Sequence, residues 1–370
     1  MKTERIDYMD AARSVLMSLG VVLHSARIYV PNSPWLVAEP MTAPIFGLIV
    51  DAIHSFRMPA FFFISGFFCA LTLERYGAGR FLRQRLPRIL LPAITVALLI
   101  NIPQVHWLIA ERQIAAPSLA AWINGQAWVL HLWFLFNLAL YFAIAAAIGP
   151  RALAAIRWVG DRLRGLGIAP DGVGGAALLI AAATAFFLLI VPLALAGLMY
   201  ERLLFFGQIF GLIRYACLFL IGFAAMSDPR FAAAWSRFGW LIVPPAIMLT
   251  WAAPQLAGSV GELADRVALL WRDMGFTWAT LLFFRWVASK PSATWRYMSD
   301  ASYSIYLLHH PIVVFLGVAL VAAPLAVGAK FGLICVAAFA LSLALHHFIV
   351  LRIPLVRLLL NGKPMSAKLS

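Results

Sequence analysis

Charged residues are scarce in this sequence: Asp, Glu, Lys and Arg make up only 12% of its 370 residues, whereas hydrophobic residues make up 63%. Ordinary soluble domains carry about 25% charged residues, so this composition excludes them. The mean hydropathy is +0.90. Apolar runs such as 176–198, 301–323 and 331–351 reach or approach the ~20 residues that span a bilayer. The composition therefore predicts an all-α, polytopic membrane protein.

Cysteine is also rare, and two common motifs are missing. Cys69, Cys217 and Cys335 lie far apart in apolar surroundings, which indicates packing and neither a disulfide framework nor a metal site. No HExxH sequence occurs, which argues against an intramembrane metalloprotease. The first apolar stretch contains Arg13 and has no small-residue cleavage site before it, so we expect an uncleaved first helix and no signal peptide.

Ten membrane spans account for the apolar pattern. We expect them at 11–30, 45–73, 88–110, 126–148, 174–198, 204–226, 238–253, 267–288, 302–322 and 331–351. With the termini included, one side of the membrane then carries twenty Lys and Arg residues and the other side six. Because the basic excess marks the cytoplasmic side, we expect both termini in the cytoplasm and a single membrane domain over 1–370. The net charge of +14 then reflects topology and predicts no nucleic-acid partner.

Ionisable side chains inside spans are costly and usually face a cavity or a partner. Arg13 and His24 stand eleven residues apart on the first span, close to three full turns, so they share a face and lie ~16 Å apart along the axis. Asp10 lies near the same face. This arrangement suits a reaction whose donor and acceptor enter from opposite sides. The alternative is that Arg13 is a flanking charge and His24 a hydrogen-bonded core residue.

The second span carries a further pair, since His54 and Arg57 are one turn apart on a shared face. We expect Pro59 to kink this span, which favours a cavity wall. Gly66 predicts a close helix approach, as small residues do in membrane interfaces. Arg214 is a further ionisable residue inside a span.

Arginines also cluster directly after the second span, at Arg83, Arg85 and Arg88. Guanidinium groups fork onto phosphate oxygens, so this cluster could hold a nucleotide-like anion at the cytoplasmic mouth of the third span. The alternative is an ordinary cytoplasmic loop.

Several short motifs together resemble the acyltransferase 3 family of membrane O-acyltransferases. They are Arg13 and His24 separated by ten residues, FRMPAFFFISGFF at 56–68, the Arg85–Arg88 pair, HLWFL at 131–135 and SYSIYLLHHP at 302–311. Within this family the sequence is most similar to the glucan biosynthesis protein C group, whose members are taken to succinylate osmoregulated periplasmic glucans. The resemblance implies ten core helices in a bacterial inner membrane, an acyl-coenzyme A donor from the cytoplasm and a glycan acceptor outside.

The resemblance also assigns roles to residues. It carries the family's first-helix Arg and His onto Arg13 and His24. His24 would be the general base, or less favourably a transient acyl carrier, because neutral histidine suits proton transfer. Arg13, with Asp10 nearby, would orient the donor or its acyl carbonyl. The phosphates of acyl-coenzyme A would lie on the arginine cluster Arg83, Arg85 and Arg88.

The remaining expectations concern the acyl group and the acceptor. If the acyl group is succinyl, Arg57 and Arg214 are the candidate cations for its far carboxylate. The other expected substrate-binding residues are His54, Tyr306, His309 and His310, with one of the last two facing the cavity and the other packing. We expect no permanently bound cofactor and no metal, and succinyl-coenzyme A is the favoured co-substrate. The expected partners are a periplasmic glucan and membrane lipids. A homodimer is left open.

Two other functions use the same features. A secondary transporter or glycan exporter could combine ten spans, proline-broken helices and intramembrane Arg and His, but it would form no covalent product. A haem-binding redox protein could pair axial ligands from His24, His54, His131 and His346.

Overall fold

The computed structural model describes residues 7–32, 35–195 and 209–362, and every regular element in these ranges is helical. The expectation of an all-α polytopic membrane protein is therefore confirmed. The chain divides into two compact units. Unit 1 comprises Met1–Arg57, Leu86–Phe136 and Lys290–Ser370, and unit 2 comprises Met58–Arg85 and Asn137–Ser289.

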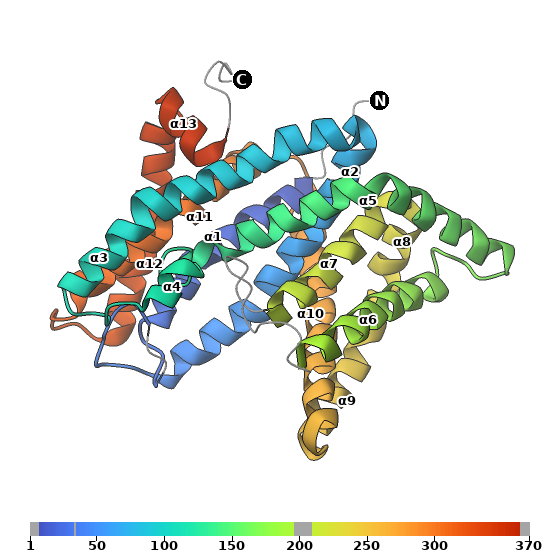
Figure 1. Cartoon of the computed structure of the whole chain (residues 1–370), viewed down its shortest axis with the longest axis horizontal. Helices are drawn as coiled ribbons and strands as arrows, with labels where there is room; N and C mark the ends of the chain where they lie inside the picture. The colour runs from blue at the N-terminus through green and yellow to red at the C-terminus, as the bar shows by residue number, and fades with distance from the viewer. Residues whose placement is uncertain (1–6, 33–34, 196–208, 363–370) are drawn as a thin grey trace. The chain divides into compact units, whose positions relative to one another are not determined.

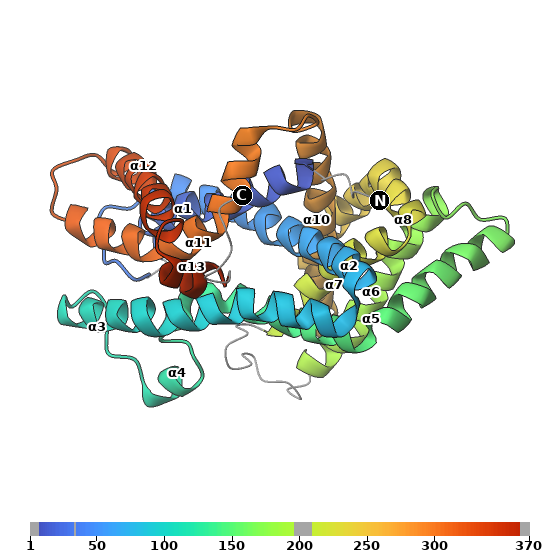
Figure 2. The same cartoon turned by 90° about the horizontal axis from the view of Figure 1, so that it is seen from above.

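Unit 1 is built from the two ends of the chain and a middle segment (Figure 1). Its elements are α1 (Asp7–Arg27), both ends of α2 (Pro44–Val96), η1 (Ala97–Asn101), α3 (Ile102–Ala110), α4 (Leu119–Ile123), η2 (Leu130–Leu132), the start of α5 (Trp133–Gly165), α11 (Ala293–Leu320), α12 (Val327–Leu345), η6 (His346–Val350) and α13 (Pro354–Asn361). α1 packs along α11 and α12, and α13 contacts α11 (Figure 2). Their shared core includes Val21, Ile305, Val313 and Ile334, so the first span of the chain is buried against its last long helices.

Unit 2 contains the middle of α2, most of α5 and the helices that follow. These are α6 (Val173–Leu195), α7 (Ile209–Ser227), α8 (Pro229–Phe238), η4 (Gly239–Ile242), α9 (Val243–Ala252), η5 (Ala253–Gln255) and α10 (Gly258–Val287). α2 and α7 cross at two glycines. A Cβ at Gly66 would collide with the backbone of Phe219, and one at Gly222 would collide with the backbone of Phe63. The expected close approach at Gly66 is confirmed.

Among the described residues, eight helical segments are long and apolar enough to cross a membrane. Segment Pro44–Ala110 covers two expected spans, and each of the other seven matches one. The first expected span corresponds to α1, which is not among the eight and carries acidic residues in its first turn. Positions 196–198 of the fifth expected span and 204–208 of the sixth lie outside the described residues. The structure therefore supports nine of the ten expected spans by length and hydropathy and does not support the first.

The break between the second and third spans lies at a glycine. Along α2, all of whose residues the structure describes, Gly77 alone leaves helical dihedral angles, with φ 73° and ψ 166°. Positive φ is readily adopted by glycine. Gly77 lies between the expected spans 45–73 and 88–110, as the sequence predicted. Pro59 keeps helical dihedral angles, and the kink expected there stays a prediction.

Candidate active site

Four histidine side chains from three separate segments gather inside unit 1. His24 lies on α1, His131 on η2, and His309 and His310 on α11. The ring centroid of His24 lies 5.0 Å from that of His310, 5.3 Å from that of His309 and 6.3 Å from that of His131. His131 and His310 stack at 4.4 Å with an interplanar angle of 12°. We call these residues the histidine cluster.

Most nitrogen atoms of the histidine cluster have no hydrogen-bond partner among the described residues. The unpaired, buried atoms are His24 Nδ1, His131 Nδ1, His131 Nε2, His309 Nε2 and His310 Nδ1. Buried polar atoms in folded proteins are nearly always paired, so such a group indicates a place that a polar ligand completes. His131, His309 and His310 are buried, whereas His24 keeps partial exposure. His24 is therefore the one ring of the cluster that keeps exposed surface.

The hydrogen bonding of His309 fixes its tautomer. His309 Nδ1 lies 3.0 Å from the carbonyl oxygen of Ile305, one turn earlier on α11. A carbonyl only accepts hydrogen bonds, so Nδ1 carries the proton and Nε2 of the neutral ring is an acceptor. A Cβ at Gly20 would lie 3.1 Å from this Nε2 and 2.9 Å from Arg57 Nη2. Glycine at position 20 thus leaves room for an imidazole and a guanidinium against α1.

Arg57 places a cation beside the histidine cluster. Its side chain is buried, and its Nε donates a 2.8 Å hydrogen bond to the carbonyl of Leu16 on α1. This bond holds the guanidinium against the same helix that carries His24. The cluster therefore combines imidazoles that can exchange protons with a fixed positive charge.

A strained backbone presents His131 to the cluster. The preceding residue, Leu130, has φ 46°, in the left-handed region that a leucine seldom adopts. Asn101 Nδ2 donates to the carbonyl of Trp128 at 2.8 Å, and the Tyr306 hydroxyl donates to the carbonyl of His131 at 2.5 Å. Such strain persists where surrounding contacts hold it, often at functional sites. His131 was not expected in the site from the sequence, although it begins the HLWFL motif.

Comparison with known proteins identifies the family of the chain. The model of a family described as an acyltransferase domain matches residues 6–347. The chain belongs to this acyltransferase family. It is also 28% identical to the Glucans biosynthesis protein C of Salmonella schwarzengrund (strain CVM19633), with 96% of this chain and 94% of that protein covered. The proteins of the same name from Salmonella heidelberg (strain SL476) and Salmonella paratyphi B (strain ATCC BAA-1250 / SPB7) show the same identity and coverage. No solved structure matches the chain.

The prediction for His309 and His310 on α11 differs in part from the structure. We expected one of His309 and His310 to face the site and the other to pack elsewhere, but both rings contact His24. Successive helical residues point about 100° apart, and the two centroids are 6.5 Å apart. His24 is close enough to both rings to contact each of them. Tyr306 also lies at the cluster, with its ring 5.3 Å from that of His131, but its hydroxyl is engaged by the backbone.

The other two residues expected on α1 lie near its start. Arg13 Nη2 donates a 2.7 Å hydrogen bond to Ser299 Oγ on α11, and it forms a 3.2 Å ion pair with Asp10. Ser299 Oγ also lies 3.4 Å from Asp10 Oδ1. These contacts join α1 to α11 at the end of α1 away from His24. The catalytic roles of Arg13 and Asp10 stay predictions.

Two expected substrate-binding residues have other surroundings. His54 is exposed on α2. Arg214 lies in unit 2, where it forms a 3.0 Å ion pair with buried Asp273 and donates to the Tyr215 hydroxyl at 2.8 Å. Arg214 is therefore already neutralised by a carboxylate within the fold.

The expected donor-binding arginines divide between the units. Arg83 is exposed and Arg85 donates to Thr72 Oγ1 at 3.0 Å, both in unit 2. Arg88 is exposed in unit 1, where its carbonyl accepts a 3.1 Å hydrogen bond from the Tyr303 hydroxyl. Their exposed or half-exposed side chains are compatible with anion binding, which stays a prediction.

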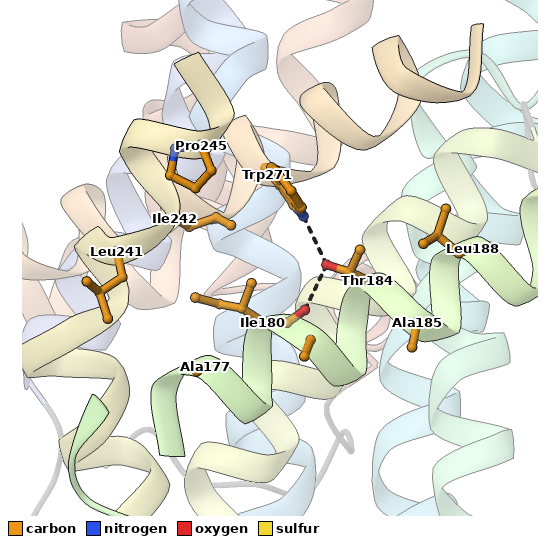
Figure 3. A pocket seen from close by; sticks show the side chains of 10 residues that line it. Ala177, Ile180, Thr184, Ala185, Leu188, Leu241, Ile242, Pro245 and Trp271 are labelled. Carbon is orange, nitrogen blue, oxygen red and sulfur yellow. Dashed lines mark hydrogen bonds between the residues drawn. The ribbon is translucent and has the colours of Figure 1, made fainter. Parts of the chain in front are cut away.

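Unit 2 contains an apolar groove of about 480 Å³. Figure 3 shows it between α6 and the segments that carry Pro245 and Trp271. Its polar point is already satisfied, because Thr184 Oγ1 accepts from Trp271 Nε1 at 2.9 Å and donates to the carbonyl of Ile180 at 2.8 Å. The groove lining offers no charged or titratable side chain, so it cannot perform acyl transfer. In the described part of the chain, no group of His, Cys, Asp or Glu residues is arranged to hold a metal ion either.

Proposed function

We propose that this membrane acyltransferase moves an acyl group, with succinyl favoured, from cytoplasmic acyl-coenzyme A to a hydroxyl of a periplasmic glucan, with His24 as general base. The observation that carries the proposal is the partly exposed His24 ring in contact with three imidazoles, each of which has at least one ring nitrogen without a partner among the described residues. The glucan acceptor is supported by the name of the relatives, which match almost the whole chain.

The reaction needs one proton to move and one bond to be exchanged. His24 takes the proton of the glucan hydroxyl as its oxygen attacks the thioester carbonyl. The carbon–sulfur bond then breaks, and the proton passes from His24 to the departing thiolate, which gives the ester and free coenzyme A. A neutral histidine suits this role near neutral pH, and a positioned general base typically contributes 10²–10⁴-fold to the rate. Transient acylation of His24 is the second route, which mass spectrometry of rapidly quenched protein would detect.

Arg57 would supply a positive charge that stabilises the negative charge formed during the reaction. Negative charge develops on the carbonyl oxygen during attack, and a succinyl group brings a carboxylate of its own. A guanidinium binds either group through charge-assisted hydrogen bonds. Its position against Gly20 and His309 supports this role.

The two ends of α1 suit substrates that arrive from opposite sides. The charge asymmetry of the loops favours a cytoplasmic start for α1, near Arg13, and His24 would then lie toward the periplasm. The donor would then enter past the arginine cluster of the sequence analysis, and the glucan would approach His24 from outside.

The test is transfer of radiolabelled succinyl from succinyl-coenzyme A to periplasmic glucan by purified protein in liposomes. We expect His24→Gln to lower kcat by about 100-fold or more. His106→Gln is the matched control, because His106 is an exposed histidine of unit 1 that stacks on Trp122 at 5.5 Å, and it should stay within about twofold of wild type.

Each outcome bears on a different part of the proposal. Full activity in His24→Gln would reject His24 as the base. If wild type transfers no acyl group from any coenzyme A thioester to any glucan, the transferase proposal fails. Movement of glucan across the liposome membrane without consumption of acyl-coenzyme A would then support the transporter.

A further inference from the structure

The segment 28–43 between α1 and α2 carries an aromatic ring to the histidine cluster. We call this segment the strap; within it, the structure describes 28–32 and 35–43. Trp35 of the strap lies 5.7 Å from His24, ring centroid to ring centroid, at an interplanar angle of 13°. It meets His310 edge-on, at 5.7 Å and 78°. Trp35 is partly buried, so it forms part of the wall of the site beside the exposed portion of His24.

A buried ion pair fixes the strap to α12. Lys330 Nζ lies 3.2 Å from Glu39 Oε2, and both side chains are about 1% exposed. Lys330 also donates to the carbonyl of Val321 at 2.8 Å, and Glu39 Oε1 accepts from the backbone N–H of Met41 at 3.2 Å. Breaking such a pair leaves an uncompensated buried charge, so this contact holds the strap firmly.

Further contacts hold the strap on the C-terminal side of Trp35. The backbone N–H of Ala38 donates to Gln113 Oε1 at 2.9 Å, and that of Ala43 donates to the carbonyl of Tyr29 at 3.0 Å. Val37 is buried against Gly317 of α11, where a Cβ would lie 3.1 Å from it. Trp35 thus stands two residues before a well-anchored stretch.

The ring geometry leaves most of the indole face uncovered by His24. Parallel rings in van der Waals contact are ~3.5 Å apart, so a 5.7 Å centroid distance implies a lateral offset of about 4.5 Å. If the rings lie side by side, their overlap is smaller still. A flat apolar surface therefore lies next to the proposed base.

We propose that Trp35 is the platform on which a sugar ring of the acceptor packs, and that the Glu39–Lys330 ion pair holds it in place. This inference rests on the proposed function. The C–H faces of a pyranose are apolar and its hydroxyls project from the ring edge, so a sugar ring packed on the indole directs a hydroxyl toward the adjacent His24. Trp35 would thereby select a glycan over a simple alcohol.

Trp35→Leu and Trp35→Phe test the platform, with Trp107→Leu as the matched control. Trp35 and Trp107 are both partly buried against the same hydrophobic core of unit 1. We expect Trp35→Leu to raise the KM for glucan about tenfold, the upper end of what one aromatic contact supplies, while the KM for succinyl-coenzyme A stays unchanged. Trp35→Phe should fall between wild type and Trp35→Leu, and Trp107→Leu should change neither KM. A lower kcat with both KM values unchanged would reduce Trp35 to a packing residue and overturn the inference.

Glu39→Gln and Lys330→Met test the tether. Each single change should raise the KM for glucan, because it leaves one buried charge unpaired. The double variant Glu39→Gln/Lys330→Gln removes both charges and should recover most of the wild-type KM. A rise in KM that the double variant retains in full would show that the ion pair does not act by holding Trp35.

Calorimetric titration of glucan into the purified protein without donor keeps the inference separate from the catalytic proposal. Weaker glucan binding by Trp35→Leu than by Trp107→Leu would support the platform even if no transfer occurs. Equal binding by the two variants would overturn the platform, whatever the activity of wild type.

Discussion

The carboxylate–arginine pairs of unit 2 and the histidine cluster of unit 1 differ in how their buried polar atoms are paired. In unit 2, buried Asp273 forms an ion pair with Arg214 at 3.0 Å, and buried Asp228 accepts hydrogen bonds from Arg230, the one from Nε measuring 2.9 Å. In unit 1, the histidine cluster leaves several buried ring nitrogens without a partner among the described residues. A charge paired inside the fold stabilises it, whereas an unpaired group keeps its capacity for a ligand.

Three glycines contrast the α2–α7 crossing with the surroundings of the histidine cluster. In unit 2, Gly66 and Gly222 bring the backbones of α2 and α7 into direct contact, which leaves no room for a ligand at that crossing. In unit 1, Gly20 makes room for the ends of two polar side chains, Arg57 and His309. Glycine therefore allows backbone contact where α2 crosses α7, and it leaves room for two polar side-chain ends at position 20. Intramembrane ionisable residues are usually functional, and the proposed function uses those of the histidine cluster and Arg57.

The largest expected effect comes from breaking the ion pair of unit 2. Asp273→Leu leaves Arg214 buried without its carboxylate, which should destabilise the protein by about 3–5 kcal/mol. The double variant Arg214→Met/Asp273→Leu should recover most of this loss, since an apolar pair replaces the ionic one. Thermal unfolding in detergent measures both. A double variant as unstable as Asp273→Leu would show that the ion pair holds more than its own two charges.

The next effect compares buried Arg57 with partly buried Arg214 in the choice of acyl group. Arg57→Met should lower succinyl transfer about 10- to 100-fold more than acetyl transfer, because one charged hydrogen-bonded contact is worth about 1.5–3 kcal/mol. Arg214→Met should lower both transfers by the same factor, since its charge is already matched by Asp273. Rates with succinyl- and acetyl-coenzyme A measure the ratio. Equal losses of the two transfers in Arg57→Met would remove Arg57 from the acyl pocket.

Hydropathy predicted the apolar segments well because a membrane span is long and its signal is averaged over about 20 residues. It also placed the break within Pro44–Ala110, because Gly77 lies between the expected spans 45–73 and 88–110. The structure breaks at Gly77, in a segment too polar and glycine-containing to extend the span. The apolar composition of the chain therefore determines where the spans lie, and the conformational freedom of glycine determines where the backbone turns between them.

Site residues could be predicted from the sequence where an ionisable side chain lies within a recognisable motif. His24, Arg57, His309 and His310 stand out as ionisable residues inside apolar runs, and the structure brings them together. His131 was missed because its place depends on contacts distant in sequence, such as the hydrogen bond from Tyr306.

Trp35 was missed for a related reason. A tryptophan near the end of a span ordinarily belongs to the aromatic belt at the membrane interface. Here an ion pair between residues 39 and 330 holds its segment against the site. No periodic pattern in the sequence encodes a contact between residues so far apart.

The smallest expected effect contrasts the glycines of the two units. Gly20→Ala adds a Cβ 2.9 Å from Arg57 Nη2 and 3.1 Å from His309 Nε2, and these side-chain ends can shift by a few tenths of an ångström. We expect little change in melting temperature but a roughly three- to tenfold loss of kcat, because catalysis is sensitive to small displacements of reacting groups.

Gly222→Ala should behave in the opposite way. Its Cβ would meet the backbone of Phe63, which cannot move without separating α2 from α7. We therefore expect a destabilisation of about 1–3 kcal/mol, with the kcat of the folded fraction close to wild type. Melting temperature and kcat measured on both variants test the contrast. If Gly20→Ala lowers the melting temperature and spares kcat, the space beside Gly20 serves packing, and the distinction between an open and a closed interior fails at that position.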